Sequence, residues 1–286
     1  MEFPVSNESG LLYVVATPIG NLDDISTRAR QILGEVDLIA AEDTRHSKKL
    51  LSHLGLSTSM QAYHDHNERS MAPRLVEKLL AGNNLALISD AGTPLLNDPG
   101  FHLVKLAHQN RIRVIPVPGP SALVSALSVA GLGTEGFIFD GFLPEKQRAR
   151  RTHLESLQSE TRTLAFYEAP HRIRACLQDC LEVFGAQRRA CIAREISKRY
   201  ETVRTESLSA LLEWLDGDAQ QLKGEFVLLI EGCREKSVPD NSEGKRVLEI
   251  LLGKMSVSDA AAMAAEISGL KKNELYKLAL EIKGDG

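Results

Sequence analysis

The 286-residue chain has no stretch of roughly 20 apolar residues, the length needed to cross a membrane. Its N-terminus has no basic segment ahead of an apolar run, and the first such run stops at Ala16, so we expect no signal peptide. Both absences favour a cytoplasmic protein without a membrane partner. The formal net charge of −4 excludes a globally basic nucleic-acid-binding protein but allows a local basic patch.

Cysteine is scarce, and the four cysteines form no C-x-x-C pair. Cys176 and Cys180 lie four residues apart on a predicted helix and share one face, whereas Cys191 and Cys233 stand alone. A free cysteine behaves as a small hydrophobic residue. We therefore expect buried thiols in a reducing compartment rather than disulfides or metal ligands.

The common cofactor and nucleophile signatures are missing as well. T-P-I-G-N-L follows the first apolar run where a dinucleotide-binding fold has G-x-G-x-x-G, and no G-x-x-x-x-G-K-[ST] loop occurs. No G-x-S-x-G elbow of an α/β-hydrolase is present. His64 and His66 form a close pair on one face of an extended segment, but no Cys or His follows at a zinc-like interval, so we expect no metal site.

Short apolar runs alternate with helical patterns through the first half of the chain. This alternation predicts βαβ units and a parallel sheet. Ser26 or Asp24 is expected to cap a first helix that Gly34 ends, and Gly55 is expected to end the second. The predicted strands are Leu11–Ala16, Val36–Ala41, the extended segment Gln61–Asn67, Leu85–Ile88 and Ile112–Val117.

The stretch Leu85–Ala122 contains two of these strands, each followed by a loop rich in Gly, Pro and small residues. Parallel strands would place the two loops side by side at their carboxyl ends, where open α/β sheets bind ligands. Together with Thr17–Leu22 and Glu42–Arg45, they expose main-chain groups suited to a flat polar ligand such as adenosine. Asp90 adds a carboxylate. Tight turns without a ligand are the alternative.

The second half is predicted to be a mixed α+β domain. Between Phe142 and Arg204 we count 13 Lys and Arg residues against 8 Asp and Glu residues. This local excess suggests a polyanionic partner, and a solvated helix face is the alternative. We expect phosphate contacts from the basic run Lys146, Arg148, Arg150 and Arg151. The predicted strands are Phe137–Phe142, Thr163–Tyr167, Ala190–Ala193 and Phe226–Glu231.

Three short helical runs end the chain, at Val247–Leu252, Asp259–Ile267 and Asn273–Ile282. They predict either a module of helix-turn-helix shape or a helical cap on the core. The domains are therefore expected at residues 1–135 for the cofactor loops, 136–235 for the second domain and 243–286 for the helical module.

Six motifs in order resemble those of the tetrapyrrole methylase superfamily and, more closely, the ribosomal RNA small subunit methyltransferase I family. They begin at Val15 (V-A-T-P-I-G-N-L-D-D-I-S), Ala41 (A-E-D-T-R), Leu87 (L-I-S-D-A-G-T-P-L-L-N-D-P-G), Val117 (V-P-G-P-S-A), Phe166 (F-Y-E-A-P-H-R) and Ala193 (A-R-E-I-S-K). The chain departs from the wider superfamily where A-T-P-I-G-N replaces G-x-G-P-G-D and S-D-A-G replaces the G-D-P motif. These departures argue against a corrinoid or porphyrin substrate.

The resemblance implies a two-domain homodimer that uses S-adenosylmethionine to methylate a cytidine ribose 2′-hydroxyl in the decoding region of 16S rRNA, in the assembled small ribosomal subunit. A tetrapyrrole or precorrin C-methyltransferase and a ligand-sensing nucleic-acid-binding regulator are the alternatives. The cofactor contacts it implies are Pro18, Ile19, Asp90, Ala91, Gly92, Thr93, Ser121, Ala122, Tyr167 and Ala193.

A 2′-hydroxyl is a weak acid, so a proton acceptor is expected to help its methylation. Carboxylates and cations at strand ends are the candidates. We hypothesise that Asp43 or Glu168 accepts the proton, and that Arg45 or Lys198 orients a phosphate or the 2′-oxygen.

Overall fold

The computed structural model describes residues 9–233 and 241–284. The chain divides into two compact units, one that holds both β-sheets and one that holds the C-terminal helices, and each is described by itself. The predicted domain limits at residues 1, 235 and 286 lie outside the described residues. No helix in the described ranges combines the length and the apolar composition of a membrane span.

The first half forms a five-stranded parallel sheet in the order β3-β2-β4-β1-β5, as the alternation predicts. One detail of the prediction is wrong, because β1 lies between β4 and β5 and so separates the two glycine-bearing loops by one strand. The segment Gln61–Asn67 also forms a strand only at its start. The strands are β1 (Leu12–Val15), β2 (Leu38–Ala41), β3 (Met60–Ala62), β4 (Leu85–Ile88) and β5 (Val114–Val117).

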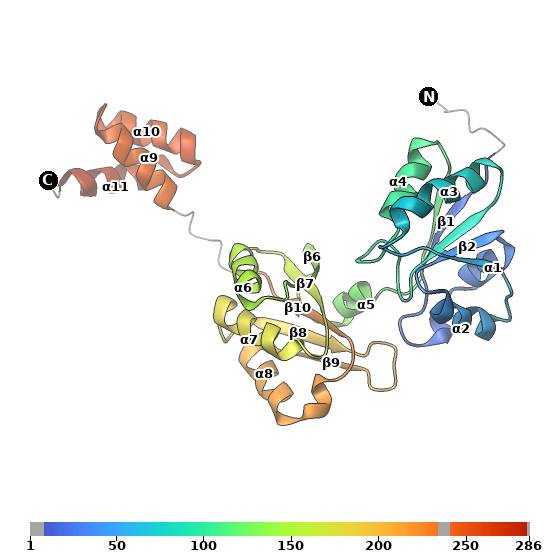
Figure 1. The fold of residues 1–286 in the computed structure, drawn as a ribbon. Coiled ribbons are helices and arrows are strands. Elements are labelled where there is room, and N and C mark those ends of the chain that lie inside the picture. The colour runs from blue at the N-terminus through green and yellow to red at the C-terminus, as the bar shows by residue number, and fades with distance from the viewer. Residues whose placement is uncertain (1–8, 234–240, 285–286) are drawn as a thin grey trace. The chain divides into compact units, whose positions relative to one another are not determined.

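Four helices cover the two faces of this sheet (Figure 1). Helices α1 (Thr27–Glu35) and α2 (Thr44–Leu54) share a core with one face, and α3 (Glu68–Leu80) and α4 (Phe101–Gln109) share a core with the other. Because β4 is covered on both sides, all four of its residues are buried.

Local signals explain most of the helix ends. The Ser26 hydroxyl accepts a hydrogen bond from the backbone N–H of Ala29, and Gly55 ends α2 with a φ of 70°, both as predicted. The predicted stop at Gly34 is wrong, because α1 continues through it to Glu35. The helix packs three buried residues on the sheet, and tertiary contacts of this kind outweigh the weak helix propensity of one glycine.

The second sheet is mixed, with the order β6-β7-β10-β8-β9. Strand β6 pairs parallel with β7, and the other neighbours are antiparallel. The sequence missed β9, since T-V-R-T-E-S has no apolar run and the strand is half-exposed along its length. The strands are β6 (Phe137–Phe142), β7 (Thr163–Glu168), β8 (Arg189–Arg194), β9 (Thr202–Ser207) and β10 (Phe226–Ile230).

Helix α5 (Ala122–Val129) packs on the second sheet, although it follows the first sheet in the chain. Leu123, Ala126 and Leu127 share a core with β7, β8 and β10. The packing of α5 therefore favours a domain limit just before Ser121, and we propose this limit in place of residue 135. The remaining helices of the unit are α6 (Gln147–Ser156), α7 (Ile173–Phe184) and α8 (Leu208–Gly217), with 3-10 turns at Leu22–Asp24 and Ala219–Leu222.

Cys176, Cys180 and Cys191 are buried, and none of the three forms a disulfide. Burial raises the pKa of all three thiols. These three cysteines therefore act as small core residues, as the sequence predicts. The prediction of burial is wrong for Cys233, which is partly exposed.

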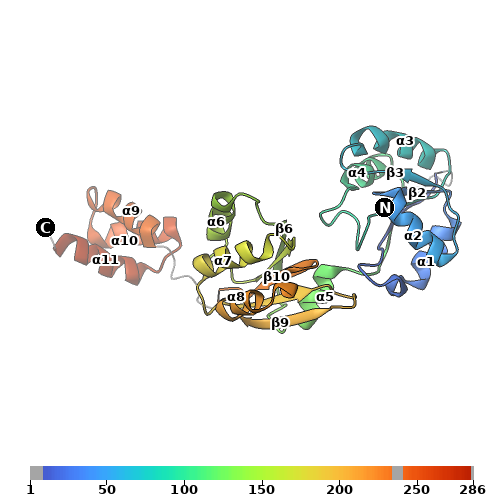
Figure 2. The same cartoon turned by 60° about the horizontal axis from the view of Figure 1, so that its bottom comes forward.

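Three helices form the C-terminal unit: α9 (Asn241–Leu252), α10 (Val257–Ser268) and α11 (Lys272–Gly284), which pack against one another (Figure 2). Small alanines of α10 and leucines of α9 and α11 form a core of their own. Ser256 caps α10 through the backbone N–H of Asp259. A separate core of this kind is what the helix-turn-helix interpretation expects.

Candidate active site

A cavity of about 380 Å³ lies where loops of the first sheet meet residues at the ends of β7, β8 and β10. Most residues predicted to bind a cofactor line it. These are Ile19, Asp90, Ala91, Gly92, Thr93, Ser121, Ala122, Tyr167 and Ala193.

Hydrogen bonds hold the loops of the first sheet together at this cavity. Thr17 and Gly92 exchange two backbone hydrogen bonds of 2.9 and 3.0 Å, which join the loops after β1 and β4. The Thr93 hydroxyl donates to the Pro120 carbonyl at 3.3 Å and so joins the loops after β4 and β5 across the intervening strand. Ser121 then caps α5. These bonds fix the backbone groups of the cavity wall.

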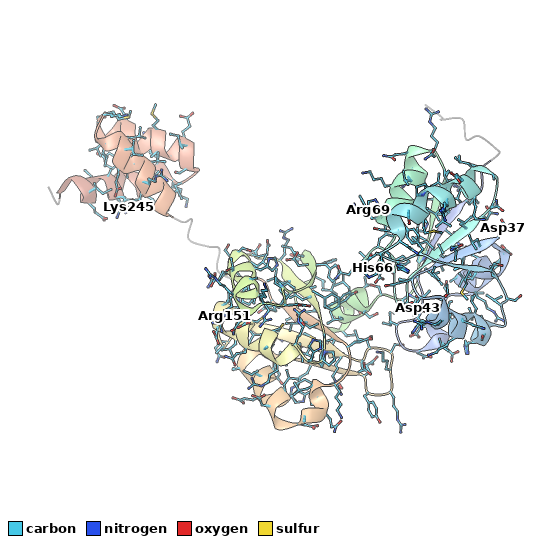
Figure 3. The ribbon with its side chains drawn as sticks, in the orientation of Figure 1. Asp37, Asp43, His66, Arg69, Arg151 and Lys245 are labelled. Atoms are coloured by element: carbon cyan, nitrogen blue, oxygen red, sulfur yellow. The ribbon has the colours of Figure 1, made fainter. Side chains whose placement is uncertain are left out.

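Four of the predicted cofactor-binding and catalytic residues do not line the cavity: Pro18, Asp43, Arg45 and Lys198. Asp43 caps α2 and binds Arg45, with 3.0 Å between Nη2 and Oδ2. The hydrogen bonds from Arg45 lower the pKa of Asp43 to about 2, which makes this carboxylate a weak base. Figure 3 shows Asp43 at the carboxyl end of β2 and Asp37 at the opposite end.

Glu168 and Lys198 are both held in ion pairs. The Glu168 carboxylate at the end of β7 is fully buried and lies 3.1 Å from Nη2 of Arg172. The Lys198 ammonium contacts Glu195 at 3.1 Å and Glu225 at 2.9 Å. Glu168 thus lines the cavity with a fixed partner, while Lys198 is outside the lining and pairs with Glu225, which lines it.

The cavity lining is anionic. It contains five carboxyl residues and no Lys, Arg or His. Glu168 and Glu225 have cationic partners. Within the described part of the chain, Glu42, Asp90 and Asp98 make no ion pair, so their charge is directed at the cavity itself.

These three carboxyl groups are coupled to one another. The Glu42 carboxylate accepts from the Asp90 N–H at 3.2 Å, and the Asp90 carboxylate accepts from the Asp43 N–H at 3.1 Å. Burial and the nearby carboxylates raise the pKa of Asp98 to about 6, although the Ser89 hydroxyl lowers it. Burial likewise raises the pKa of Glu42.

Sequence reasoning missed part of this site. Glu42 stands inside the quoted motif A-E-D-T-R, and Asp98 stands inside L-L-N-D-P-G, so the motifs could have indicated both residues. The spacing of the motifs does not show which carboxylate faces the cavity. Five further lining residues also stand inside the quoted motifs, namely Leu96, Asn97, Ala169, Pro170 and Ile196. Tertiary folding adds residues from outside the motifs, namely Phe142, Glu225, Phe226 and Val227.

The predicted phosphate-binding run on α6 needs a correction at Arg150. Its side chain is only 5% exposed, and Nη2 lies 2.6 Å from Oδ2 of the fully buried Asp179. Arg150 also donates to the carbonyls of Pro144 and Glu145. It is therefore a structural residue. Arg151 is partly exposed but pairs with Asp179 and Glu182, whereas Lys146 and Arg148 are exposed.

No group of three His, Cys, Asp or Glu side chains within residues 9–233 and 241–284 is arranged to hold a metal ion. His64 and His66 lie with their rings 5.9 Å apart, just after the end of β3.

Solved structures share the fold at low sequence identity. A uroporphyrin-III-C-methyltransferase from Thermus thermophilus matches with a TM-score of 0.55 and 17% identity over 78% of this chain and 94% of its own. A diphthine synthase matches with a TM-score of 0.58 and 14% identity over 78% and 90% of the two chains. A further structure of the Thermus enzyme, with a TM-score of 0.53 and 16% identity over 77% and 97% of the chains, is described as complexed with S-adenyl homocysteine.

Comparison with families and curated proteins is more specific. Residues 11–212 match the family Tetrapyrrole (Corrin/Porphyrin) Methylases, and residues 238–283 match the RsmI C-terminal HTH domain. Ribosomal RNA small subunit methyltransferase I of Pseudomonas aeruginosa is 52% identical, covering 96% of this chain and 99% of the relative. The Synechocystis protein of the same name is 44% identical, covering 97% and 100%. The chain therefore belongs to the tetrapyrrole methylase family and, within it, to the methyltransferases named ribosomal RNA small subunit methyltransferase I.

Proposed function

We propose that this enzyme transfers a methyl group from S-adenosylmethionine to the ribose 2′-hydroxyl of a cytidine in the decoding region of 16S rRNA. Similarity over nearly the whole chain to enzymes named for the small ribosomal subunit supports the RNA substrate. The observation in the structure that carries the proposal is the anionic cavity at the meeting of the two sheets.

The residues present fit S-adenosylmethionine, which carries a positively charged sulfonium and an ammonium group. A cavity of about 380 Å³ is in the size range of small-molecule sites. Ile19, Phe142 and Tyr167 offer apolar surface for an adenine ring, and the carboxylates of Glu42, Asp90 and Asp98 suit the cationic groups. When bound, this cofactor supplies an electrophilic methyl group.

The same electrostatics argue against a tetrapyrrole substrate. Precorrins carry several carboxylates, and a lining with five acidic and no basic side chains would repel them. The fold shared with a uroporphyrin methyltransferase therefore does not extend to its substrate. RNA can present a single ribose to the cavity and keep its phosphates outside.

We propose that the phosphates are bound by exposed cations outside the cavity. Lys146, just before α6, and Arg148, on α6, are exposed, and Arg151 on the same helix is partly exposed. Arg45 is 91% exposed and held by Asp43, so its guanidinium is presented to solvent close to the carboxyl end of β2. Lys271 and Lys272 in the helical module are exposed as well. We propose that the substrate is the assembled small subunit, in the cytoplasm.

We also propose a homodimer. Val124 and Val129 on α5 are 60% and 57% exposed, and Val203 on β9 is 39% exposed. Val129 and Val203 both line a second cavity. An exposed apolar surface of this kind suits a second copy of the chain.

Catalysis in this site needs alignment and proton removal. The loops fixed by the Thr17–Gly92 and Thr93–Pro120 hydrogen bonds orient the donor and exclude water, and alignment alone can supply a large part of a rate enhancement. Proton removal needs a carboxylate within reach of the ribose hydroxyl. Asp43 and Glu168 stay predictions for that role, as does Lys198 for orienting the substrate.

The test is methyl transfer from labelled S-adenosylmethionine to purified small subunits, to free 16S rRNA and to a precorrin, followed by mapping of the modified nucleotide. We expect label on a cytidine ribose of the assembled subunit. Label on the precorrin, or on a nucleobase, would contradict the proposal.

A further inference from the structure

One carboxyl group of the cavity, that of Asp98, has been described so far only as part of the anionic lining. Asp98 lies in the loop between β4 and α4 and lines the cavity beside Asn97. Its side chain is partly buried, and the nearby Ser89 hydroxyl, which donates to the Ala91 carbonyl at 3.3 Å, influences its carboxyl group.

That loop is held in an unusual backbone conformation. Leu95 and Asn97 have φ values of 73° and 67°, a region that non-glycine residues rarely adopt. Gly100 has a φ of 141°, and a Cβ there would lie 2.8 Å from the Leu87 side chain, so glycine is required. The Gly100 N–H donates to the Glu68 carboxylate at 3.2 Å. Strain of this kind persists where the surrounding structure fixes a functional group.

Charged and titratable groups face Asp98 from several elements. Glu42 follows β2, Asp65 follows β3, Asp90 follows β4 and Tyr167 lies on β7. All of the carboxylates among them disfavour the ionised form of Asp98. A positive charge in the cavity would favour it.

The other carboxyl groups of the site contact other protein groups. Glu168 is buried against Arg172, and Asp43 is bound by Arg45 outside the cavity lining. Glu42 and Asp90 each accept a backbone N–H. From these contacts we infer that Asp98 is the group that accepts the proton of the substrate hydroxyl. The inference rests on the proposed function.

The step balances without a further reactant. The hydroxyl O–H bond breaks, and its proton passes to the Asp98 carboxylate. The oxygen forms the new bond to the methyl group as the bond from that methyl to the sulfonium sulfur breaks, and the thioether leaves. The carboxyl proton then returns to solvent when the product leaves the site.

Such a base has a pKa close to the pH at which it works, which is the favourable condition for general-base catalysis. The burial and neighbouring carboxylates that hold the pKa of Asp98 at about 6 meet this condition. Asp43, with a pKa of about 2, does not.

The experiment compares wild type with Asp98→Asn and Asp98→Glu, in single-turnover methyl transfer to small subunits from about pH 5 to about pH 9. Asp37→Asn is the matched control, since Asp37 is exposed at the opposite end of β2 (Figure 3). We expect Asp98→Asn to lower the rate about 10²- to 10⁴-fold and to abolish the fall in rate below about pH 6. Asp98→Glu should restore part of the rate together with the acid limb.

Calorimetry of S-adenosylmethionine binding, in two buffers of different ionisation enthalpy, gives a second readout. Near pH 6 the wild type should release protons when it binds the cationic cofactor, because the added charge lowers the pKa of the facing carboxyl. Asp98→Asn should still bind the cofactor and release fewer protons.

Three results would overturn the inference. An Asn variant with the wild-type rate and acid limb shows that another group takes the proton. An Asn variant that folds but no longer binds cofactor assigns Asp98 to binding. If wild type itself transfers no methyl group to small subunits, the proposed function fails and this inference fails with it.

Discussion

The two sheets differ in whether their buried or cavity-facing charged residues form ion pairs. At the second sheet, Arg150 and Asp179 are buried against each other, and Glu168 is buried against Arg172. At the first sheet, Glu42, Asp90 and Asp98 face the cavity without an ion pair among the described residues. Paired charges in the second sheet stabilise the fold, whereas unpaired carboxylates in the first are available for a cationic ligand and for proton transfer.

The difference follows from how each sheet is built. Carboxyl ends of parallel strands gather at one edge, so several loops deliver side chains to one place. The second sheet is covered by α6 and α7, whose arginines and aspartates end up inside and must find partners. Four predictions test this contrast.

Breaking the buried pair should have the largest effect. Arg150→Ala leaves the Asp179 carboxylate without its buried partner, and the loss of one partner of a buried ion pair costs about 3–5 kcal/mol. Chemical denaturation measures the free energy of unfolding. A loss below about 1 kcal/mol would return Arg150 to the candidates for phosphate binding.

The strained loop of the first sheet comes next. Gly100→Ala forces a side chain into a φ of 141° and against Leu87, and we expect it to lower the free energy of unfolding by about 1–3 kcal/mol. It should also lower the rate of methyl transfer, because Asp98 moves with the loop. Unchanged stability and rate would show that the loop is not held as described.

Asp98→Asn should raise stability, in contrast to its effect on rate. The pKa of Asp98 in the folded state is raised from 3.8 to about 6. The contribution of protonated Asp98 to the free energy of unfolding is therefore complete below about pH 4 and is lost as the pH rises through 6. At about pH 7 the Asn variant should be more stable by about 1 kcal/mol, after discounting for solvent screening of this partly exposed group. Thermal melts at about pH 4 and about pH 7 check the sign, since the gain should vanish at the lower pH.

Arg148→Ala should have the smallest effect on stability, within about 0.5 kcal/mol, because the side chain is exposed. If Arg148 contacts a phosphate, the variant should bind RNA more weakly and reduce the slope of log affinity against log salt by about one. Filter binding at several salt concentrations measures the slope. An unchanged slope excludes that contact.

Local patterns predicted the elements best. The strand Leu85–Ile88 appears in the structure with the predicted bounds, because the burial of a short apolar run depends on adjacent residues. The sequence did not predict β9, because this strand forms by pairing with β8 and not through an apolar run of its own. Strand β8 begins at Arg189, 13 residues before β9 begins at Thr202.

The site residues likewise divide into those that local motifs predicted and those that depend on the tertiary structure. Motifs around Asp90–Thr93 and Ser121–Ala122 predicted residues that do line the cavity. Arg150 was predicted to be a surface cation because a helical run of basic residues does not show which member turns inward. Asp43 was predicted as a proton acceptor because it directly follows a strand, and the sequence does not show that Arg45 pairs with it.

By itself the sequence determined the family, the alternation that produces a parallel sheet, and the loops that hold small residues, since each depends on residues close in the chain. Tertiary structure alone decided that α5 packs on the second sheet, that β1 separates the two glycine loops, and which carboxylates face the cavity unpaired. The physical reason is that burial and charge pairing are set by distances between segments far apart in the chain.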